Sequence, residues 1–259
     1  MVATKQPTGR MPGMTTAEEQ EKYRQAGSFG AAADAYERGR PPYPPEAVAW
    51  LVPDRARTVV DLGAGTGKLT RALRAPGRDV VAVEPSAGMR EQFSQVLPDV
   101  RVLDGTGESI PLPDSSVDTL VCAQAWHWVN PRRAVPEVAR VLRPAGRLGL
   151  VWNLRDVSVP WVAELDRILR DYAAAPTEDR QVERVGAPFG SVERQDFRWS
   201  HPMTAGEVMA MIGSRSYVIT LEPVTREELL ARVRTLLDAK RPTEMPYVTE
   251  CYRAELELP

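Results

Sequence analysis

Short apolar runs alternate with segments of helical periodicity along the middle of the chain. Residues 58–62, 80–83 and 100–103 are rich in Val and Leu, as strands buried on both faces of a parallel sheet usually are. The first two runs are followed by helix-compatible segments that end near proline or glycine. This alternation predicts a parallel sheet with helices packed on both of its faces.

The same pattern continues toward the end of the chain. Further strands are predicted at 118–123, 147–152, 192–199 and 245–254. Further helices are predicted at 131–142, 161–174, 204–212 and 224–237. We therefore expect an α/β fold with a doubly wound, seven-stranded, mostly parallel sheet whose last strand is antiparallel, and with helical insertions.

Composition divides the chain into a tail and one domain. Residues 1–27 mix Gly, Pro, Thr, Gln and charged residues without periodicity, so we expect a flexible tail. Residues 28–259 are enough for one large α/β domain with insertions and few for two independent domains. Within that domain, 28–50 leads into a first helix, 57–153 carries the strand–helix alternation, and 154–259 adds insertions and the last strands.

A glycine-rich turn follows the first strand. Gly63, Gly65 and Gly67 occupy alternate positions, and glycine permits positive φ and close approach of the backbone to a ligand. The spacing G-x-G-x-G differs from the dinucleotide fingerprint G-x-G-x-x-G. Asp61 stands two residues before the turn, and a carboxylate there favours a cationic ligand over a pyrophosphate because like charges repel. Glu84 ends the second strand, where a carboxylate can hold both hydroxyls of a ribose.

The order D-x-G-x-G-x-G, followed by an acid that ends the second strand, resembles the class I S-adenosylmethionine (SAM)-dependent methyltransferases of the type 11 kind. The resemblance implies a Rossmann-like fold, SAM as the methyl donor, S-adenosylhomocysteine (SAH) as the product, and no metal. The core residues that it implies for cofactor binding are Asp61, Gly63, Ala64, Gly65, Thr66, Gly67, Glu84, Pro85, Met89, Ala123, Gln124 and Ala125.

The segment before the first helix carries a second resemblance. Its Tyr…Arg-Pro-x-Tyr-Pro pattern, with Tyr36, Arg40 and Tyr43, is similar to a subset that includes trans-aconitate methyltransferase-like enzymes. In that subset the segment folds over the cofactor as an N-terminal lid. The resemblance implies that Tyr36 and Arg40 meet the methionine carboxylate, with Tyr43 near the acceptor. The alternative is that the aromatic residues only anchor the segment and Arg40 is solvated.

The loop after the third strand departs from the family pattern. Residues 104–112 resemble the loop G-D-A-E-x-L-P-F, which lies along the adenine edge in the family. Thr106 stands where an adenine-binding acid is common, and Gly107 replaces alanine. Backbone contact at Gly107 stays compatible with adenine, whereas a carboxylate for the adenine amine would have to come from Glu108.

An aromatic cluster follows the fourth strand. Ligands of doubly wound sheets bind at the carboxyl ends of the strands where the strand order reverses, so Trp126, His127 and Trp128 are expected beside the transferred methyl group. His127 is the candidate general base. The alternative is an imidazole that shapes the pocket wall between the two indoles. The other residues expected to line the acceptor site are Tyr43, Asn153, Arg155, Arg215 and Tyr217.

Charge and composition restrict the acceptor and its surroundings. The net charge is −2, so the chain has no global cationic field with which to hold a nucleic acid. No run of 18 or more apolar residues appears. Two cysteines and two histidines are too few for a typical metal cage. We expect a soluble cytoplasmic enzyme with a small-molecule acceptor and with neither a nucleic-acid nor a membrane partner.

The leading hypothesis is methyl transfer from SAM to an oxygen, nitrogen or carboxylate of a small metabolite or natural product. One alternative is a nucleic-acid or protein methyltransferase, although the N/D-P-P-Y/F tetrapeptide of base-directed enzymes is absent after the fourth strand. The others are a catalytically silent SAM-binding scaffold and an NAD-dependent oxidoreductase. The acceptor, the attacking atom and the oligomeric state stay open.

Overall fold

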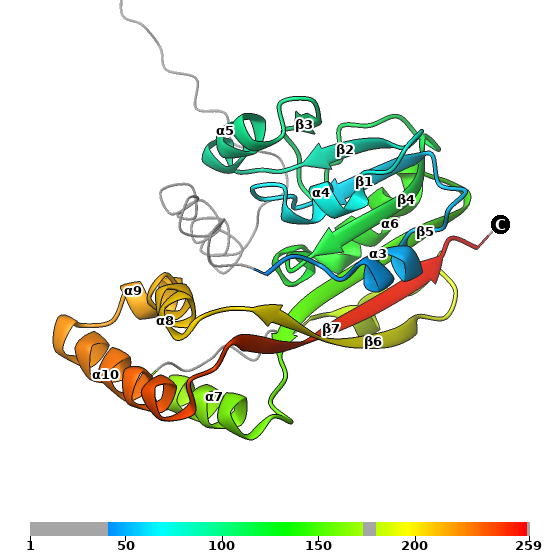
Figure 1. Cartoon of the computed structure of the whole chain (residues 1–259). Helices are drawn as coiled ribbons and strands as arrows, with labels where there is room; N and C mark the ends of the chain where they lie inside the picture. The colour runs from blue at the N-terminus through cyan, green and yellow to red at the C-terminus, as the bar shows by residue number, and fades with distance from the viewer. Residues whose placement is uncertain (1–40, 173–179, 258–259) are drawn as a thin grey trace, which may run out of the picture.

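Seven strands form one mixed sheet in the order β3-β2-β1-β4-β5-β7-β6 (Figure 1). The computed structural model describes residues 41–172 and 180–257. The strands β3, β2, β1, β4 and β5 are parallel to one another, whereas β7 is antiparallel to both β5 and β6. Six strands therefore share one direction, and the predicted Rossmann-like sheet with an antiparallel last strand is confirmed. The strands are β1 (Thr58–Leu62), β2 (Asp79–Val83), β3 (Arg101–Leu103), β4 (Val117–Ala123), β5 (Leu142–Arg155), β6 (Glu193–Pro202) and β7 (Glu244–Glu255).

Several helices begin at a capping residue. The side chains of Ser86, Asn130 and Thr204 each accept a hydrogen bond from a backbone N–H in the first turn of their helix. The helices are α3 (Pro45–Leu51), α4 (Lys68–Leu73), α5 (Ala87–Val96), α6 (Pro131–Val141), α7 (Pro160–Tyr172), α8 (Ala205–Gly213), α9 (Ser216–Ile219) and α10 (Pro223–Lys240). Two short 3₁₀ helices are η2 (Trp126–Trp128) and η3 (Val182–Arg184).

Alternation along β1 places its side chains in two cores. Val60 and Leu62 belong to the core that α6 covers, while Val59 belongs to the core beneath α3 and α4. Phe93 of α5 packs on Ala82, so α5 lies on the same face of the sheet as α4. Helices therefore cover both faces, and the carboxyl ends of the parallel strands are left for a site.

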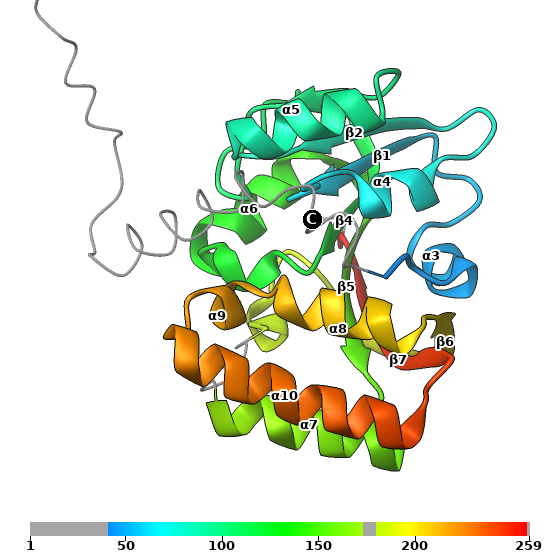
Figure 2. The ribbon, with the colours of Figure 1, turned by 60° about the vertical axis from the view of Figure 1, so that its left-hand side comes forward.

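A third core lies in a helical lobe formed by α7, α8, α9 and α10. Val162, Val208 and Val233 are fully buried in this lobe, together with Tyr247 of β7. The lobe lies beyond the carboxyl ends of β5 and β6 (Figures 1 and 2). It therefore borders the edge of the sheet at which the parallel strands end.

Two segments differ from what the sequence pattern predicts. β5 begins at Leu142, five residues early, because Leu142 pairs with Val117 before a register shift. The polar stretch expected as a loop after α8 contains the short helix α9. Tyr36 and Arg40 lie outside the described residues, so the predicted lid and tail stay predictions. Within the described ranges, no helix is long and apolar enough to cross a membrane.

Candidate functional site

The glycine turn at the end of β1 is tied to the end of β2. The backbone N–H groups of Gly63 and Ala64 both donate to the carbonyl of Val83, at 2.8 and 3.2 Å. Gly63, Gly65 and Gly67 all have positive φ, at 70°, 55° and 91°. A side chain is strained in this region of φ, which accounts for glycine at all three positions.

The three glycines face different surroundings. A Cβ on Gly63 would lie 2.7 Å from the Cβ of Ala125, and one on Gly67 would lie 2.6 Å from Cδ1 of Leu97. A Cβ on Gly65 would meet nothing within 4 Å. Gly63 and Gly67 are therefore required by packing, whereas the open space at Gly65 admits a ligand against bare backbone.

Glu84 is fixed toward this turn by two backbone groups. Its Oε2 accepts a hydrogen bond from the N–H of Gly65 at 2.9 Å, and its Oε1 accepts one from Ser86 at 2.8 Å. Only 7% of Glu84 is exposed, and this burial raises the pKa of its carboxyl group. Arg90 donates to the carbonyl oxygens of Glu84 and Pro85 and forms a two-point ion pair with Asp104. The end of β2 and the loop after β3 are thus held together.

Asp61 is buried beneath α4 and carries an unsatisfied oxygen. The hydroxyl of Thr70 donates to its Oδ2 at 2.6 Å, while Oδ1 is buried with no hydrogen-bond partner among the described residues. Burial raises the pKa of Asp61 to about 7, and the charge of Glu84 adds to the rise. A cation placed near Asp61 would favour its ionised form.

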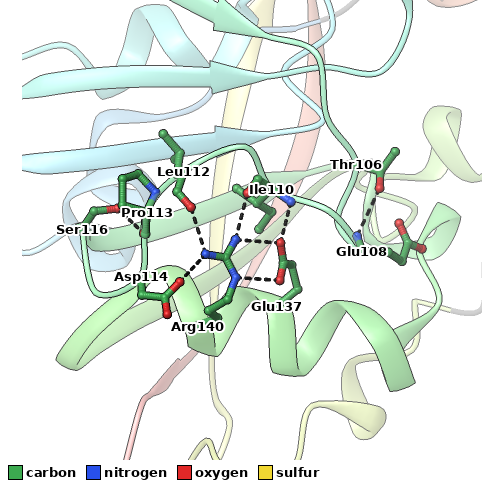
Figure 3. A network of polar contacts seen from close by, with 9 residues as sticks. All are labelled: Thr106, Glu108, Ile110, Leu112, Pro113, Asp114, Ser116, Glu137 and Arg140. Carbon is green, nitrogen blue, oxygen red and sulfur yellow. Dashed lines mark hydrogen bonds and ion pairs between the residues drawn. The ribbon is translucent and has the colours of Figure 1, made fainter.

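An arginine of α6 fastens the loop predicted to follow the adenine edge (Figure 3). Arg140 donates to the carbonyl oxygens of Ile110 and Leu112 and to the carboxylates of Asp114 and Glu137. Glu137 in turn accepts a hydrogen bond from the N–H of Ile110 at 2.7 Å. Residues 110–114 are therefore attached to the sheet-covering helix at several points.

The first part of the same loop is fixed by Glu108. Its Oε1 accepts a hydrogen bond from the N–H of Asn130 at 2.6 Å, and its own N–H donates to Oγ1 of Thr106. A Cβ on Gly107 would lie 2.7 Å from Cγ1 of Val129, so glycine is needed there for packing. Contact of Thr106, Gly107 and Glu108 with adenine stays a prediction.

The chain turns sharply where β4 ends. Gln124 has a positive φ of 57°, and its N–H donates to the carbonyl of Val151 at 2.9 Å. Trp126 is fully buried in the core under α6. His127 and Trp128 are partly exposed, with ring centroids 4.8 Å apart. The predicted aromatic cluster therefore splits into a core indole and a partly exposed imidazole–indole pair.

The remaining predicted acceptor residues have identifiable neighbours. Arg155 forms an ion pair with Asp166 of α7 at 2.8 Å, and each side chain is only 16% exposed. The side-chain amide of Asn153 donates to the carbonyl of Pro42 at 2.9 Å. Tyr217 packs against the core of the helical lobe, and Arg215 lies two residues earlier, just before α9. Contact of these residues with an acceptor stays a prediction.

The other predicted cofactor residues lie at the strand ends or in the turns after them, with Met89 in the first turn of α5. Ala64, Thr66 and Met89 are buried, and Ala123 and Ala125 are partly exposed. Tyr43 packs beside α3 and α4, and it is the third residue of the first described range, 41–172. The structure thus gathers the predicted residues of β1, β2 and β4 at one edge of the sheet.

Gln181 is a site residue that the sequence pattern does not reveal. Its side-chain amide donates to the carbonyl oxygens of His127 and Val129, at 3.3 Å each, and its Oε1 accepts a hydrogen bond from Arg184. Only 5% of Gln181 is exposed. A lone glutamine carries no local signal, because the turn that it holds lies 54 residues away along the chain.

Comparisons with known proteins agree with this geometry. Residues 60–150 match the family described as "Methyltransferase domain". An uncharacterized methyltransferase of Mycobacterium tuberculosis is 52% identical over 237 residues, which are 88% of this chain and 96% of the relative. A putative type II methyltransferase from Anaeromyxobacter dehalogenans has a similar structure, with a TM-score of 0.68 and 24% identity over 84% of this chain and 98% of that one. Phospholethanolamine N-methyltransferase 2 of Haemonchus contortus, solved with SAH, has a TM-score of 0.56 and 13% identity over 96% of this chain and 62% of that one.

Proposed function

The chain belongs to the class I SAM-dependent methyltransferases, and we propose that it transfers a methyl group from SAM to an oxygen, nitrogen or carboxylate of a small metabolite or natural product. The observation that carries this proposal is the pairing of Glu84 with Gly65. The carboxylate hydrogen-bonds to the backbone of a glycine whose Cβ position is open. A ribose can lie against that backbone and reach the fixed carboxylate with its hydroxyls.

Asp61 supports a cationic ligand at the same edge. Its buried Oδ1 has no hydrogen-bond partner among the described residues, and a diphosphate beside it would be repelled by the ionised form. We assign the backbone of Gly63 and Gly65 to the body of SAM and Glu84 to its ribose. The loop that contains Gly107 and Glu108 is assigned to the adenine edge.

The sulfonium of SAM supplies an activated methyl group, so the chain's own residues mainly have to orient the acceptor. Orientation can contribute roughly 7–11 kcal/mol, whereas a general base typically contributes 10²- to 10⁴-fold, about 3–5 kcal/mol. His127 and Trp128 form the exposed pair at the end of β4. We assign Trp128 to the acceptor wall and His127 to the same wall or to proton acceptance.

The surroundings of this edge suit a small acceptor. A helical lobe with its own core lies beyond the carboxyl ends of β5 and β6 (Figure 1), which restricts the room for a folded protein or a duplex. The net charge of −2 provides no field to hold a nucleic-acid backbone. Both features support a metabolite-sized partner.

Methyl-labelled SAM tests the proposal directly. The purified protein is incubated with labelled SAM and metabolite extracts, and products are identified by mass spectrometry. We expect label in a small molecule. Label found only in protein or nucleic acid would support the alternative acceptors, and SAM binding by calorimetry without any transfer would indicate a silent scaffold. Tighter binding of NAD than of SAH would overturn the cofactor assignment.

A further inference from the structure

Asn153, near the carboxyl end of β5, joins two other chain segments at the edge of the sheet. Its side-chain Nδ2 donates to the carbonyl of Pro42 at 2.9 Å, just before α3. Its own carbonyl accepts a hydrogen bond from Nε2 of Gln124 at 3.2 Å, just after β4. One residue therefore links β5 to the segment before α3 and to the turn after β4.

A buried hydroxyl on β7 fixes the orientation of the Asn153 amide. Thr249 is fully buried and lies opposite Asn153 in the β5–β7 register. Its Oγ1 accepts a hydrogen bond from Nε1 of Trp199 at 2.8 Å and lies 2.6 Å from Oδ1 of Asn153. The indole N–H of Trp199 donates to the Thr249 oxygen, which leaves the single hydroxyl hydrogen of Thr249 available for Asn153, and the carbonyl of Pro42 can only accept. The amide must therefore accept from Thr249 with its oxygen and present its nitrogen to Pro42.

Side-chain contacts continue from Trp199 to the helical lobe. Trp199 of β6 stacks on Tyr247 of β7, with ring centroids 5.4 Å apart at 25°. The hydroxyl of Tyr247 lies 3.5 Å from the sulfur of Met211 in α8. A continuous path of side-chain contacts thus runs from α8 through Thr249 to Asn153.

At its other end the path reaches the glycine turn. Gln124 is held in a left-handed conformation, which is strained for a residue with a side chain and persists only where the surroundings enforce it. Its neighbour Ala125 occupies the space that a Cβ on Gly63 would need. A shift of Gln124 would therefore change the packing of the turn assigned to the cofactor.

We propose that Asn153 is a positioning residue for the cofactor site, and that Thr249 sets the direction of its amide. The Asn153 amide holds Pro42, and the backbone carbonyl of Asn153, on the same stretch of β5, holds the side chain of Gln124. The place of this stretch of β5, which the Thr249 hydrogen bond fixes, therefore maintains the contact between Ala125 and Gly63. The inference rests on the proposed function insofar as SAM binds at the glycine turn.

The test measures SAH affinity by calorimetry on the full chain. Thr249→Val keeps the size of the side chain but removes the hydroxyl, and we expect it to weaken SAH binding roughly 5- to 30-fold, the effect of losing one or two hydrogen bonds in the site. Thr249→Ser restores the hydroxyl and is expected to bind within about two-fold of the wild type, since the hydrogen bonds are kept. The matched control is Thr119→Val, because Thr119 is equally buried in β4 and its hydroxyl has no hydrogen-bond partner among the described residues.

Nuclear magnetic resonance of the indole N–H groups gives a second readout. We expect SAH to shift the Trp199 signal, assigned with Trp199→Phe, in the wild type and not in Thr249→Val. Should Thr249→Val fail to fold, Asn153→Ala at the partly exposed edge replaces it, with the same expected loss of affinity. A wild type that does not bind SAH would contradict the proposed function. A wild type that binds SAH no better than folded Thr249→Val or Asn153→Ala, or a Thr249→Ser as weak as Thr249→Val, would overturn the positioning role alone.

Discussion

Glu84 Oε2 lies 2.9 Å from the backbone nitrogen of Gly65, and this hydrogen bond joins the end of β2 to the centre of the glycine turn. The two residues are 19 positions apart in the chain, and the parallel pairing of β1 with β2 brings them together. The carboxylate is therefore held in place before a ligand arrives, which lowers the entropy cost of binding.

Glu84→Ala should weaken SAM binding by roughly 1.5–3 kcal/mol, the scale of a hydrogen bond to a charged group. Calorimetry with SAM and SAH measures the loss. Glu91→Ala, an exposed acid on α5, is the control for a change in net charge. An affinity of Glu84→Ala equal to that of the control would refute the ribose role.

Gly65→Ala should mainly reduce SAH binding, whereas Gly67→Ala should mainly reduce the free energy of unfolding. Each places an alanine at positive φ, which costs about 1–2 kcal/mol, but only the Gly67 substitution also clashes, with Leu97 at 2.6 Å and Phe93 at 3.0 Å. We expect Gly65→Ala to fold and to lose SAH binding, and Gly67→Ala to lose more of its free energy of unfolding. Urea unfolding and calorimetry on both variants separate the effects. Full SAH affinity in Gly65→Ala would show that no ligand approaches that backbone.

Asp61 should make stability depend on pH. The pKa of Asp61 in the folded protein is about 7, above the ordinary value of 3.8, so between these pH values the folded state holds a proton that the unfolded state has lost. Protonated Asp61 makes its full contribution to the free energy of unfolding below about pH 4. That contribution falls as the pH rises through 7, by up to about 4 kcal/mol. Asp61→Asn should remove this loss, so the variant gains stability over the wild type between pH 4 and 8. Urea unfolding of both proteins across this range checks it, and parallel curves would contradict the assignment.

His127→Ala should separate the two roles left open for the imidazole. If His127 accepts the proton, turnover should fall about 10²- to 10⁴-fold with little change in SAM affinity, and the remaining activity should lose its dependence on pH. If His127 only shapes the wall, His127→Asn should retain most of the activity and the pH profile should be unchanged. Steady-state rates across pH, once an acceptor is in hand, distinguish the two outcomes.

Arg140→Met should destabilise the protein by about 1.5–3 kcal/mol, because the carbonyls of Ile110 and Leu112 and the carboxylate of Glu137 lose a charged donor. Because part of the guanidinium is exposed to solvent, the loss of stability should be smaller than on breaking a fully buried ion pair. Thermal unfolding measures the change. Arg133→Met on the exposed face of the same helix is the matched control, and equal midpoints in the two variants would contradict the role of Arg140.

The cofactor half of the molecule was readable from the sequence because its signals are local. β1 spans the apolar run 58–62, the helix α4 follows the glycine turn, and the side chains of Ser86 and Asn130 cap α5 and α6 at their first turns. Each of these features depends on residues within a few positions of one another. Strand, glycine turn and helix form a unit that the sequence specifies without help from distant segments.

The acceptor half was less readable because its contacts join distant residues. Asn153 and Thr249 are 96 positions apart, and no sequence pattern in either strand indicates their hydrogen bond. Arg155 is a cation of the kind that binds carboxylates, but α7 packs back on β5 so that Asp166 pairs with its guanidinium. Gly107 is expected to contact the ligand through its backbone, but Val129 lies where a side chain at this position would be. Similarity of the segment around Tyr43 to the trans-aconitate-like subset stays a prediction.

The chain leaves β6 for α8 and returns to β7 at nearly the same point, where the N–H of Met203 donates to the carbonyl of Thr243 at 3.0 Å. Helices α8 to α10 thus form an insertion with adjacent junctions, and they share their core with α7 and Tyr247. Exchange of this insertion between relatives at its two junctions would replace helices on the proposed acceptor side and leave β1 and β2, with the proposed SAM contacts, unchanged. Chimeras spliced at Met203 and Thr243 would make that exchange in the laboratory.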